Sequence, residues 1–270
     1  MTSINSKTIV FITGAFVSHL GWNHWIDYFE SKGYTCYAPP WPYKEGTARE
    51  LRMKQPNDEE LALSSYKGVV DSYADFIKKL PEKPIVIGHS LGGLTTQLMI
   101  YRNLGAAGVM IHSVAPQGVL SFEWSFIKSI WKPLGYFTSR KRTHLMSLSE
   151  WQYAFTNGLS LKDQQESYDQ STIPESKTVL RDTLTSVSKV DFNKPHAPLL
   201  FISGSTDHIM PASLNYTNYK KYKDPGSITE YKEFEGHNHY VLGLPTWREE
   251  ADYILNWIDK YSAPRELRYS

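Results

Sequence analysis

The stretch that decides the fold reads Ile85-Val86-Ile87-Gly88-His89-Ser90-Leu91-Gly92-Gly93. It joins a short apolar run to a helical pattern, which is the strand, turn and helix context of a Gly-x-Ser-x-Gly motif. Ser90 is predicted to lie on the sharp turn, where its hydroxyl is a candidate nucleophile. Gly88 and Gly92 are expected where the strand and helix backbones come too close for a Cβ atom. Because this pentapeptide alone is common, its chemical partners must be sought along the rest of the chain.

Composition predicts a globular chain with a sizeable core. The 270 residues are 41% hydrophobic, which is enough for a large α/β domain. Lysine and arginine number 29 against 28 acidic residues. This balance excludes a strong electrostatic attraction to nucleic acid or to anionic membranes. We therefore expect a small-molecule partner, no nucleic acid and no membrane, and nothing in the sequence indicates an oligomer.

The sequence also predicts a cytoplasmic location. Cys36 is the only cysteine, so no intrachain disulfide can form and nothing suggests an oxidising compartment. The first apolar run, Ile9 to Ile12, is too short for the core of a signal peptide or for a membrane span.

Strand and helix signals alternate along most of the chain, which is typical of an α/β fold. We predict a mainly parallel six-stranded sheet with helices on both faces. The polar stretch from Lys44 to Glu60 is interpreted as an irregular surface excursion. The apolar runs that predict strands lie at 8–13, 34–38, 85–87, 108–114, 198–204 and 228–234.

The alternation stops between the fourth and fifth of these strands. Residues 117–193 contain no convincing strand but many aromatic residues, and Trp151 and Phe155 stand one helical turn apart. We expect a helical cap, or lid, that is inserted into one core domain formed by residues 1–116 and 194–270.

The final helix carries the clearest helix-start signal. Thr246 as N-cap and Glu249 three residues later match the capping-box pattern, and an apolar stripe follows as far as Ile258. The sequence therefore predicts a helix whose first turn is capped by the Thr246 side chain.

A nucleophilic serine needs a base within hydrogen-bond reach and an acid that orients the base. In an open parallel sheet such a site forms at the carboxyl ends of the strands. Asp207 directly follows the predicted strand that ends at Gly204, so it is the candidate acid. The chain order of serine, acid and histidine favours a base in the loop 235–240. The histidines that lie late in or after predicted strands are His112, His208, His237 and His239.

Three segments together carry a resemblance to a known family: Gly88 to Gly93, Gly204 to Pro211, and Phe234 to His239. On these segments the chain resembles the α/β-hydrolase superfamily, and within it the smaller esterase-like members with an inserted cap. The resemblance covers nearly the whole chain. It implies a cofactor-free, carboxylesterase-like serine hydrolase that acts on a small apolar ester or related acyl compound.

The resemblance also implies the roles of individual residues. It implies a catalytic triad of Ser90, Asp207 and His239. Similar members carry the base three residues after the glycine of the last motif, here Gly236, which favours His239 and leaves His237 as the alternative.

The oxyanion hole of similar members uses two backbone N–H groups. Here these would belong to Leu91, which follows the candidate nucleophile, and to Ala15, with Phe16 as the alternative. The chain departs from the family pattern in one respect, because Thr13-Gly14 stands where His-Gly is usual.

The substrate pocket is expected to be apolar, and its predicted binding residues are Phe16, Trp41, Trp124 and Trp151. Ordinary core packing is the alternative explanation for most of these side chains. Because one fold serves many reactions, other functions stay open, namely a lactonase, a C–C bond hydrolase, a cofactor-free peroxidase or a small-ligand receptor without turnover.

Zinc binding is a further interpretation of the histidine-rich loops. His237 and His239, with Asp207 and His208, offer imidazole and carboxylate ligands. The serine turn already accounts for this arrangement, so we expect no metal and no cofactor.

Overall fold

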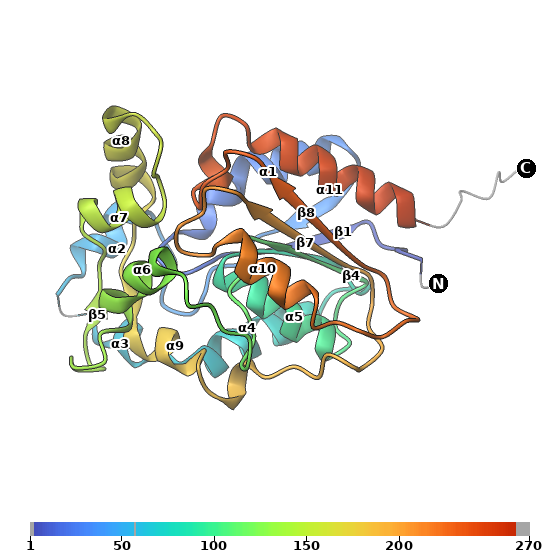
Figure 1. Cartoon of the computed structure of the whole chain (residues 1–270), viewed down its shortest axis with the longest axis horizontal. Helices are drawn as coiled ribbons and strands as arrows, with labels where there is room; N and C mark the ends of the chain where they lie inside the picture. The colour runs from blue at the N-terminus through green and yellow to red at the C-terminus, as the bar shows by residue number, and fades with distance from the viewer. Residues whose placement is uncertain (1–2, 57, 263–270) are drawn as a thin grey trace, which may run out of the picture.

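The computed structural model describes residues 3–56 and 58–262, and its centre is one parallel sheet (Figure 1). The strand order is β2-β1-β3-β4-β7-β8, and every neighbouring pair is parallel. All six predicted strands are present, so the predicted α/β fold is confirmed. The strands are β1 Thr8–Ile12, β2 Thr35–Tyr37, β3 Ile85–His89, β4 Ala107–Ile111, β7 Leu199–Gly204 and β8 Thr229–Phe234.

Strand β4 ends three residues earlier than predicted, and the reason lies in its backbone partners. The Ser113 N–H donates to the Asn215 side chain at 3.0 Å, and the Val114 N–H donates to the carbonyl of Ser90 at 3.0 Å. These bonds turn the chain away from the neighbouring strand. They also tie the end of β4 to the Ser90 turn.

Helices cover both faces of the sheet, as predicted. One face packs against α1 and α11, and the other packs against α4 and α5, with α10 beside β7 and β8 (Figure 1). No helix in the described ranges has the length and apolar character needed to cross a bilayer. The helices of this core are η1 His19–Trp22, α1 Asn23–Ser31, α4 Tyr66–Ile77, α5 Leu91–Tyr101, α10 Ala212–Tyr219, η3 Val241–Gly243 and α11 Trp247–Tyr261.

Residues 117–193, called the insertion below, are mainly helical and gather at one end of the molecule (Figure 1). The insertion also contains one antiparallel pair of two-residue strands, which the sequence did not predict. Two residues are too few to leave an alternating pattern. The elements of the insertion are α6 Trp124–Leu134, β5 Thr143–His144, α7 Leu148–Ala154, α8 Leu161–Ser171, β6 Glu175–Ser176, α9 Lys177–Asp182 and η2 Ser186–Ser188.

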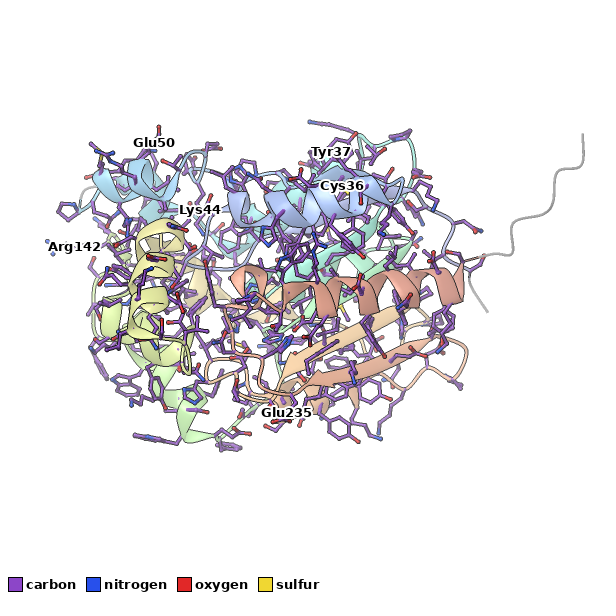
Figure 2. The ribbon with its side chains drawn as sticks, turned by 90° about the horizontal axis from the view of Figure 1, so that it is seen from above. Cys36, Tyr37, Lys44, Glu50, Arg142 and Glu235 are labelled. Atoms are coloured by element: carbon purple, nitrogen blue, oxygen red, sulfur yellow. The ribbon has the colours of Figure 1, made fainter. Side chains whose placement is uncertain are left out.

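The interpretation of residues 44–60 as an irregular excursion is wrong. Two short helices form there, α2 Ala48–Met53 and α3 Glu59–Leu63. Thr47 and Glu50 make a capping box that starts α2, and Leu51 packs against Ile173 of the insertion. Figure 2 shows Lys44 and Glu50 at the insertion's end of the molecule. Tertiary packing against the insertion therefore stabilises helices that are too short to be stable alone.

The predicted capping box of α11 is also wrong. Thr246 has φ −88° and ψ 4°, and its side chain makes no capping hydrogen bond. The Glu249 N–H donates instead to the Thr246 backbone carbonyl at 2.9 Å. An N-cap side chain reaches the first turn from an extended backbone, whereas Thr246 already lies in a turn.

These observations predict different effects of removing two hydroxyl groups. In α7 the Ser147 hydroxyl accepts from the Glu150 N–H at 3.3 Å, and the Glu150 carboxylate accepts from the Ser147 N–H at 2.7 Å. Ser147→Ala should lower the free energy of unfolding by about 1 kcal/mol, because it removes a working cap. Thr246→Ala should change it by less than about 0.5 kcal/mol. Urea unfolding of both variants is the measurement, and equal losses would contradict this assignment.

Candidate active site

Ser90 occupies the sharp turn between β3 and α5. Its backbone has φ 57° and ψ −121°, which is a strained conformation for a residue with a side chain. A Cβ atom on Gly88 would lie 2.1 Å from the Gly92 carbonyl oxygen, and one on Gly92 would lie 2.0 Å from the Ile12 carbonyl oxygen. The turn can therefore form only with glycine at both positions, as the sequence motif predicts.

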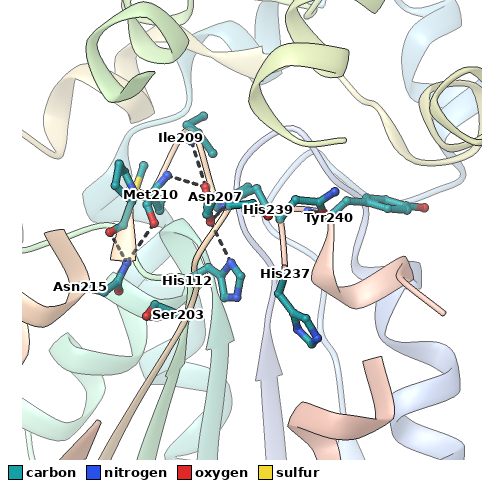
Figure 3. A network of polar contacts seen from close by, with 12 residues as sticks. His112, Ser203, Asp207, Ile209, Met210, Asn215, His237, His239 and Tyr240 are labelled. Carbon is teal, nitrogen blue, oxygen red and sulfur yellow. Dashed lines mark hydrogen bonds and ion pairs between the residues drawn. The ribbon is translucent and has the colours of Figure 1, made fainter. Parts of the chain in front are cut away.

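Asp207 lies in the loop after β7 and is fixed by four hydrogen bonds (Figure 3). Its Oδ1 accepts from the N–H groups of Ile209 and Met210 at 2.9 and 2.7 Å. Its Oδ2 faces Nδ1 of His239 at 2.6 Å and Nδ1 of His112 at 2.8 Å. Burial opposes ionisation, but His239 and His112 lower the pKa of Asp207 well below its usual value. The carboxyl group is therefore ionised at neutral pH.

The four histidines that follow strands have different hydrogen-bond partners in the structure. Nδ1 of His208 bonds to the carbonyl of Tyr153 at 2.8 Å, and Nδ1 of His237 bonds to Oε1 of Glu250 at 2.7 Å. Neither histidine contacts Asp207, whereas His112 and His239 both do. The ring of His237 points away from Asp207 in Figure 3.

Of the two histidines on Asp207, only His239 has a nitrogen that is free to accept a proton. Both ring nitrogens of His112 face carboxylates, because its Nε2 lies 3.3 Å from Oε1 of Glu250. Nε2 of His239 is buried and has no hydrogen-bond partner within residues 3–56 and 58–262. A general base needs such a free nitrogen.

The structure joins Ser90 to His239 through neighbouring groups rather than directly. In this structure no hydrogen bond links the Ser90 hydroxyl to the His239 ring. The next residue back, His89, contacts the His239 carbonyl through its Nε2 at 3.0 Å, and the two imidazole centroids are 4.7 Å apart. In unliganded enzymes the contact between nucleophile and base is often long and shortens when substrate binds.

The loop after β1 packs directly on the Ser90 turn. A Cβ atom on Gly14 would lie 2.7 Å from Cβ of Ser90, so the glycine allows close approach. The carbonyl of the preceding Thr13 accepts from Nε1 of Trp41 at 3.1 Å. This indole bond supports the loop where similar proteins have His-Gly instead of Thr13-Gly14.

A buried ion pair holds the next residues of this loop. Oε2 of Glu175, in β6 of the insertion, accepts from the Phe16 N–H at 3.3 Å and pairs with Nζ of Lys44. Nζ of Lys44 also lies 3.8 Å from the ring centroid of Trp41. Because Glu175 already occupies the Phe16 N–H, this group is less suited than the Ala15 N–H to bind a substrate oxygen.

An apolar cavity of about 440 Å³ opens beside Ser90, between the core and the insertion. Ala15 and Leu91 line it next to Ser90, and Phe126 and Leu180 are among the side chains that the insertion contributes. A second cavity of about 340 Å³ is lined by His239 and by polar residues that include Ser18 and Ser171. Phe155 lines both cavities, and its ring meets the His239 imidazole edge-on at 4.6 Å.

The structure places the four predicted binding residues in different surroundings. Phe16 lines the cavity beside Ser90. Trp41 is buried against the loop after β1, and Trp151 is buried in a stack on Phe155, with ring centroids 4.2 Å apart. Trp124 is 73% exposed and lines a separate surface groove. Of the four, only Phe16 is among the residues that line the Ser90 cavity.

Sequence reasoning missed Glu250 and the ion pair of Lys44 with Glu175. Glu250 is fully buried, and its position four residues before Ile254 lies on the apolar stripe of α11. An acidic residue on such a stripe is a signal that could have identified it. Lys44 and Glu175 are 131 residues apart, so no local pattern relates them.

His112, Asp207 and His239 each place one possible ligand atom within 4.8 Å of the others. Ligands of tetrahedral zinc lie about 3.3 Å from one another, given bond lengths of about 2.0–2.2 Å. The contacts of 2.6 and 2.8 Å to Asp207 are shorter and match hydrogen bonds. We therefore describe the cluster as hydrogen bonded.

Comparisons with known proteins agree with this fold. The chain matches no curated protein in sequence. It superposes on an extracellular α/β-hydrolase from a Paenibacillus species with a TM-score of 0.66 at 17% identity, covering 95% of this chain and 99% of the other. The TM-score with tomato methylketone synthase I in complex with β-ketoheptanoate is 0.67 at 15% identity, covering 96% of this chain and 100% of the other. The TM-score with a Paleococcus ferrophilus monoacylglycerol lipase is 0.64 at 20% identity, covering 94% of this chain and 95% of the other.

These likenesses show a shared fold, and a family model shows the family. The model described as the alpha/beta hydrolase family matches residues 9–251, which is most of the chain. The resemblance identified from the sequence motifs is thereby confirmed, and the chain belongs to the α/β-hydrolase family.

Proposed function

We propose that the protein is a cofactor-free serine hydrolase that cleaves a carboxylic ester, or a related acyl compound, through an acyl-enzyme. The observation that carries the proposal is the environment of His239. Its Nδ1 lies 2.6 Å from the ionised Asp207 carboxylate, and its Nε2 has no hydrogen-bond partner in the part of the chain that the structure describes. This arrangement orients an imidazole as general base, and Ser90 stands on a strained turn next to His89, which contacts His239.

The proposed reaction has two halves. Ser90 attacks the acyl carbonyl while Nε2 of His239 takes the hydroxyl proton, and the proton then passes to the leaving alcohol. A water molecule, activated by His239 in the same way, hydrolyses the acyl-enzyme. Asp207 stabilises the imidazolium that forms in each half, which its lowered pKa supports because the carboxylate stays charged.

The negatively charged tetrahedral oxygen would be bound by the N–H groups of Ala15 and Leu91. Both residues line the cavity beside Ser90, and Leu91 is the first residue of α5. The bond from the Phe16 N–H to Glu175 supports the choice of Ala15 over Phe16. Preorganised donors of this kind typically contribute 10²–10³ in rate each.

The lining of the cavity beside Ser90 supports an apolar acyl group as substrate. Beside Ser90 the insertion contributes mainly aliphatic and aromatic side chains, among them Phe126, Ile130 and Leu180. A polar or charged acyl group would lose its hydration there without gaining partners. Lactones are also acyl compounds, so a panel of esters, lactones and amides would identify the preferred leaving group.

Ser90→Ala should reduce hydrolysis of a small activated ester by roughly 10³-fold or more, because it removes the nucleophile. His239→Ala should cause a loss of similar size, since the two residues act as a unit. The measurement is kcat/KM on p-nitrophenyl esters. Ser72→Ala is the matched control, because the Ser72 hydroxyl bonds to the Val69 carbonyl within α4, away from the Ser90 cavity.

A fluorophosphonate probe tests the same proposal without a natural substrate. Mass spectrometry should find the adduct on Ser90 in the wild-type protein and no adduct in Ser90→Ala. Full activity in Ser90→Ala, or a wild-type Ser90 that the probe does not label, would overturn the mechanism. The second result would favour a receptor with the same fold.

A cavity variant tests the acyl site. Ile130→Trp should lower kcat/KM for an octanoate ester at least tenfold relative to the acetate ester, because the larger ring fills apolar space beside Ser90. Trp124→Ala, on the same helix α6 but outside this cavity, should keep the octanoate-to-acetate ratio within about twofold. A changed ratio in Trp124→Ala would instead place that ring in the binding site.

A further inference from the structure

Behind Asp207 lies a second set of ionisable groups that the proposed triad does not require. His112, which follows β4, bonds to Asp207 through Nδ1 and approaches Oε1 of Glu250 through Nε2 at 3.3 Å. The same oxygen of Glu250 accepts from Nδ1 of His237 at 2.7 Å. All of these side chains are buried. The buried network therefore runs from His239 through Asp207 and His112 to Glu250 and His237.

The contacts of His112 specify its protonation state. A neutral imidazole has one N–H and one lone pair, so it can donate to only one of two acceptors. Here both nitrogens face carboxylate oxygens, and only the imidazolium satisfies both. Burial opposes the charge, but the carboxylates of Glu250 and Asp207 raise the pKa of His112 to about 9. At neutral pH His112 is therefore a buried cation between two carboxylates.

The backbone fixes this cation in place. His112 has φ 47°, in the left-handed region, and its N–H donates to the Ile202 carbonyl at 2.8 Å. Across from it, a Cβ atom on Gly204 would lie 2.2 Å from the His237 carbonyl oxygen and 2.6 Å from Cε1 of the imidazole. A strained backbone and a glycine that leaves room for the ring indicate a built site rather than a side chain that fills space.

We propose that His112 is a positioning residue that, as a fixed cation balanced by Glu250, sets the basicity of His239 through the carboxylate they share. This inference rests on the proposed function, in which His239 is the base. The two ring centroids are 6.1 Å apart, and a permanent positive charge at that distance disfavours a second one on His239. Both imidazoles contact the same carboxylate oxygen, so the charge on His112 opposes the uptake of a proton by His239.

The other titratable groups around His112 do not change the charges on His112 and its two carboxylate partners. The only further titratable ring packed near it is His89, with centroids 6.2 Å apart, among the residues that the structure describes. Burial and the neighbouring His239 and His112 hold the pKa of His89 well below its usual value, so His89 is neutral. Glu250 faces both His112 and His237, and His237 also approaches Glu249 at 3.4 Å on the exposed side.

The test is the pH dependence of kcat/KM for ester hydrolysis in His112→Gln. Glutamine keeps an amide donor for Asp207 but has no charge. Loss of the cation should make the base easier to protonate. The acidic limb of the profile should therefore shift toward higher pH by about one unit. A role in packing alone would lower activity at every pH without moving the limb.

A double variant separates charge from structure. In His112→Gln, Glu250 is left without its counter-charge and adds to the upward shift. His112→Gln/Glu250→Gln should therefore return the limb at least halfway to the wild-type position. His196→Gln is the matched control, because His196 is a half-buried histidine before β7 that bonds to the Ala197 carbonyl. It should leave the limb unchanged.

The outcomes are distinguishable. If Ser90→Ala is inactive and folded His112→Gln shows an unshifted limb, this inference fails and the proposed function stands. A double variant that shifts as far as the single one also overturns it. If Ser90→Ala stays active, the proposed function fails, and nitrogen-15 NMR still tests the cation. At pH 7 the wild-type spectrum should contain a doubly protonated imidazole signal that is missing in His112→Gln, and the same set of signals in both proteins would overturn the inference.

The raised pKa of His112 also predicts how stability depends on pH. A group whose pKa is higher in the folded state stabilises fully below its unfolded pKa, about 6.5, and loses that contribution as the pH rises through about 9. The free energy of unfolding should therefore fall between pH 6.5 and 9.5 in the wild-type protein. Urea unfolding should show a shallower decline in His112→Gln, and equal declines would contradict a charged His112.

Discussion

The candidate site depends on the hydrogen bonds that the Asp207 carboxylate accepts. A buried carboxylate is costly unless it is hydrogen bonded on all sides, and Asp207 meets this condition with two backbone N–H groups and two imidazoles. The backbone bonds orient its loop after β7. The imidazoles come from the ends of two other segments, so one side chain connects β4, β7 and the loop after β8.

The parallel sheet explains why these segments meet. Strands β3, β4, β7 and β8 are neighbours, and the loops at their carboxyl ends carry Ser90, His112, Asp207 and His239. Local features then adjust each side chain within this frame. Positive φ angles turn Ser90 and His112, and glycines let adjacent backbones approach.

Sequence patterns predicted those parts of the structure that depend on local order. The strands are continuous apolar runs, and the Ser90 turn and the loop around Asp207 are short motifs, so both were predictable. The start of α11 was not, because the pattern of Thr246 and Glu249 says nothing about the turn before it. The helices at 48–53 and 59–63 escaped prediction because packing against the insertion stabilises them. Glu175 and Glu250 also escaped prediction, because Lys44 and His112, the residues they contact, are distant in sequence.

The bond between Glu175 and the Phe16 N–H has a mechanical consequence. It fastens β6 of the insertion to the very loop that carries Ala15, and the buried ammonium of Lys44 reinforces the joint. Moving β6 away from the core would expose this ion pair to water and break the bond to the Phe16 N–H. The cost of separating these buried groups opposes any movement of β6. At the α6 border of the cavity beside Ser90, by contrast, the Trp131 side chain is 60% exposed to solvent.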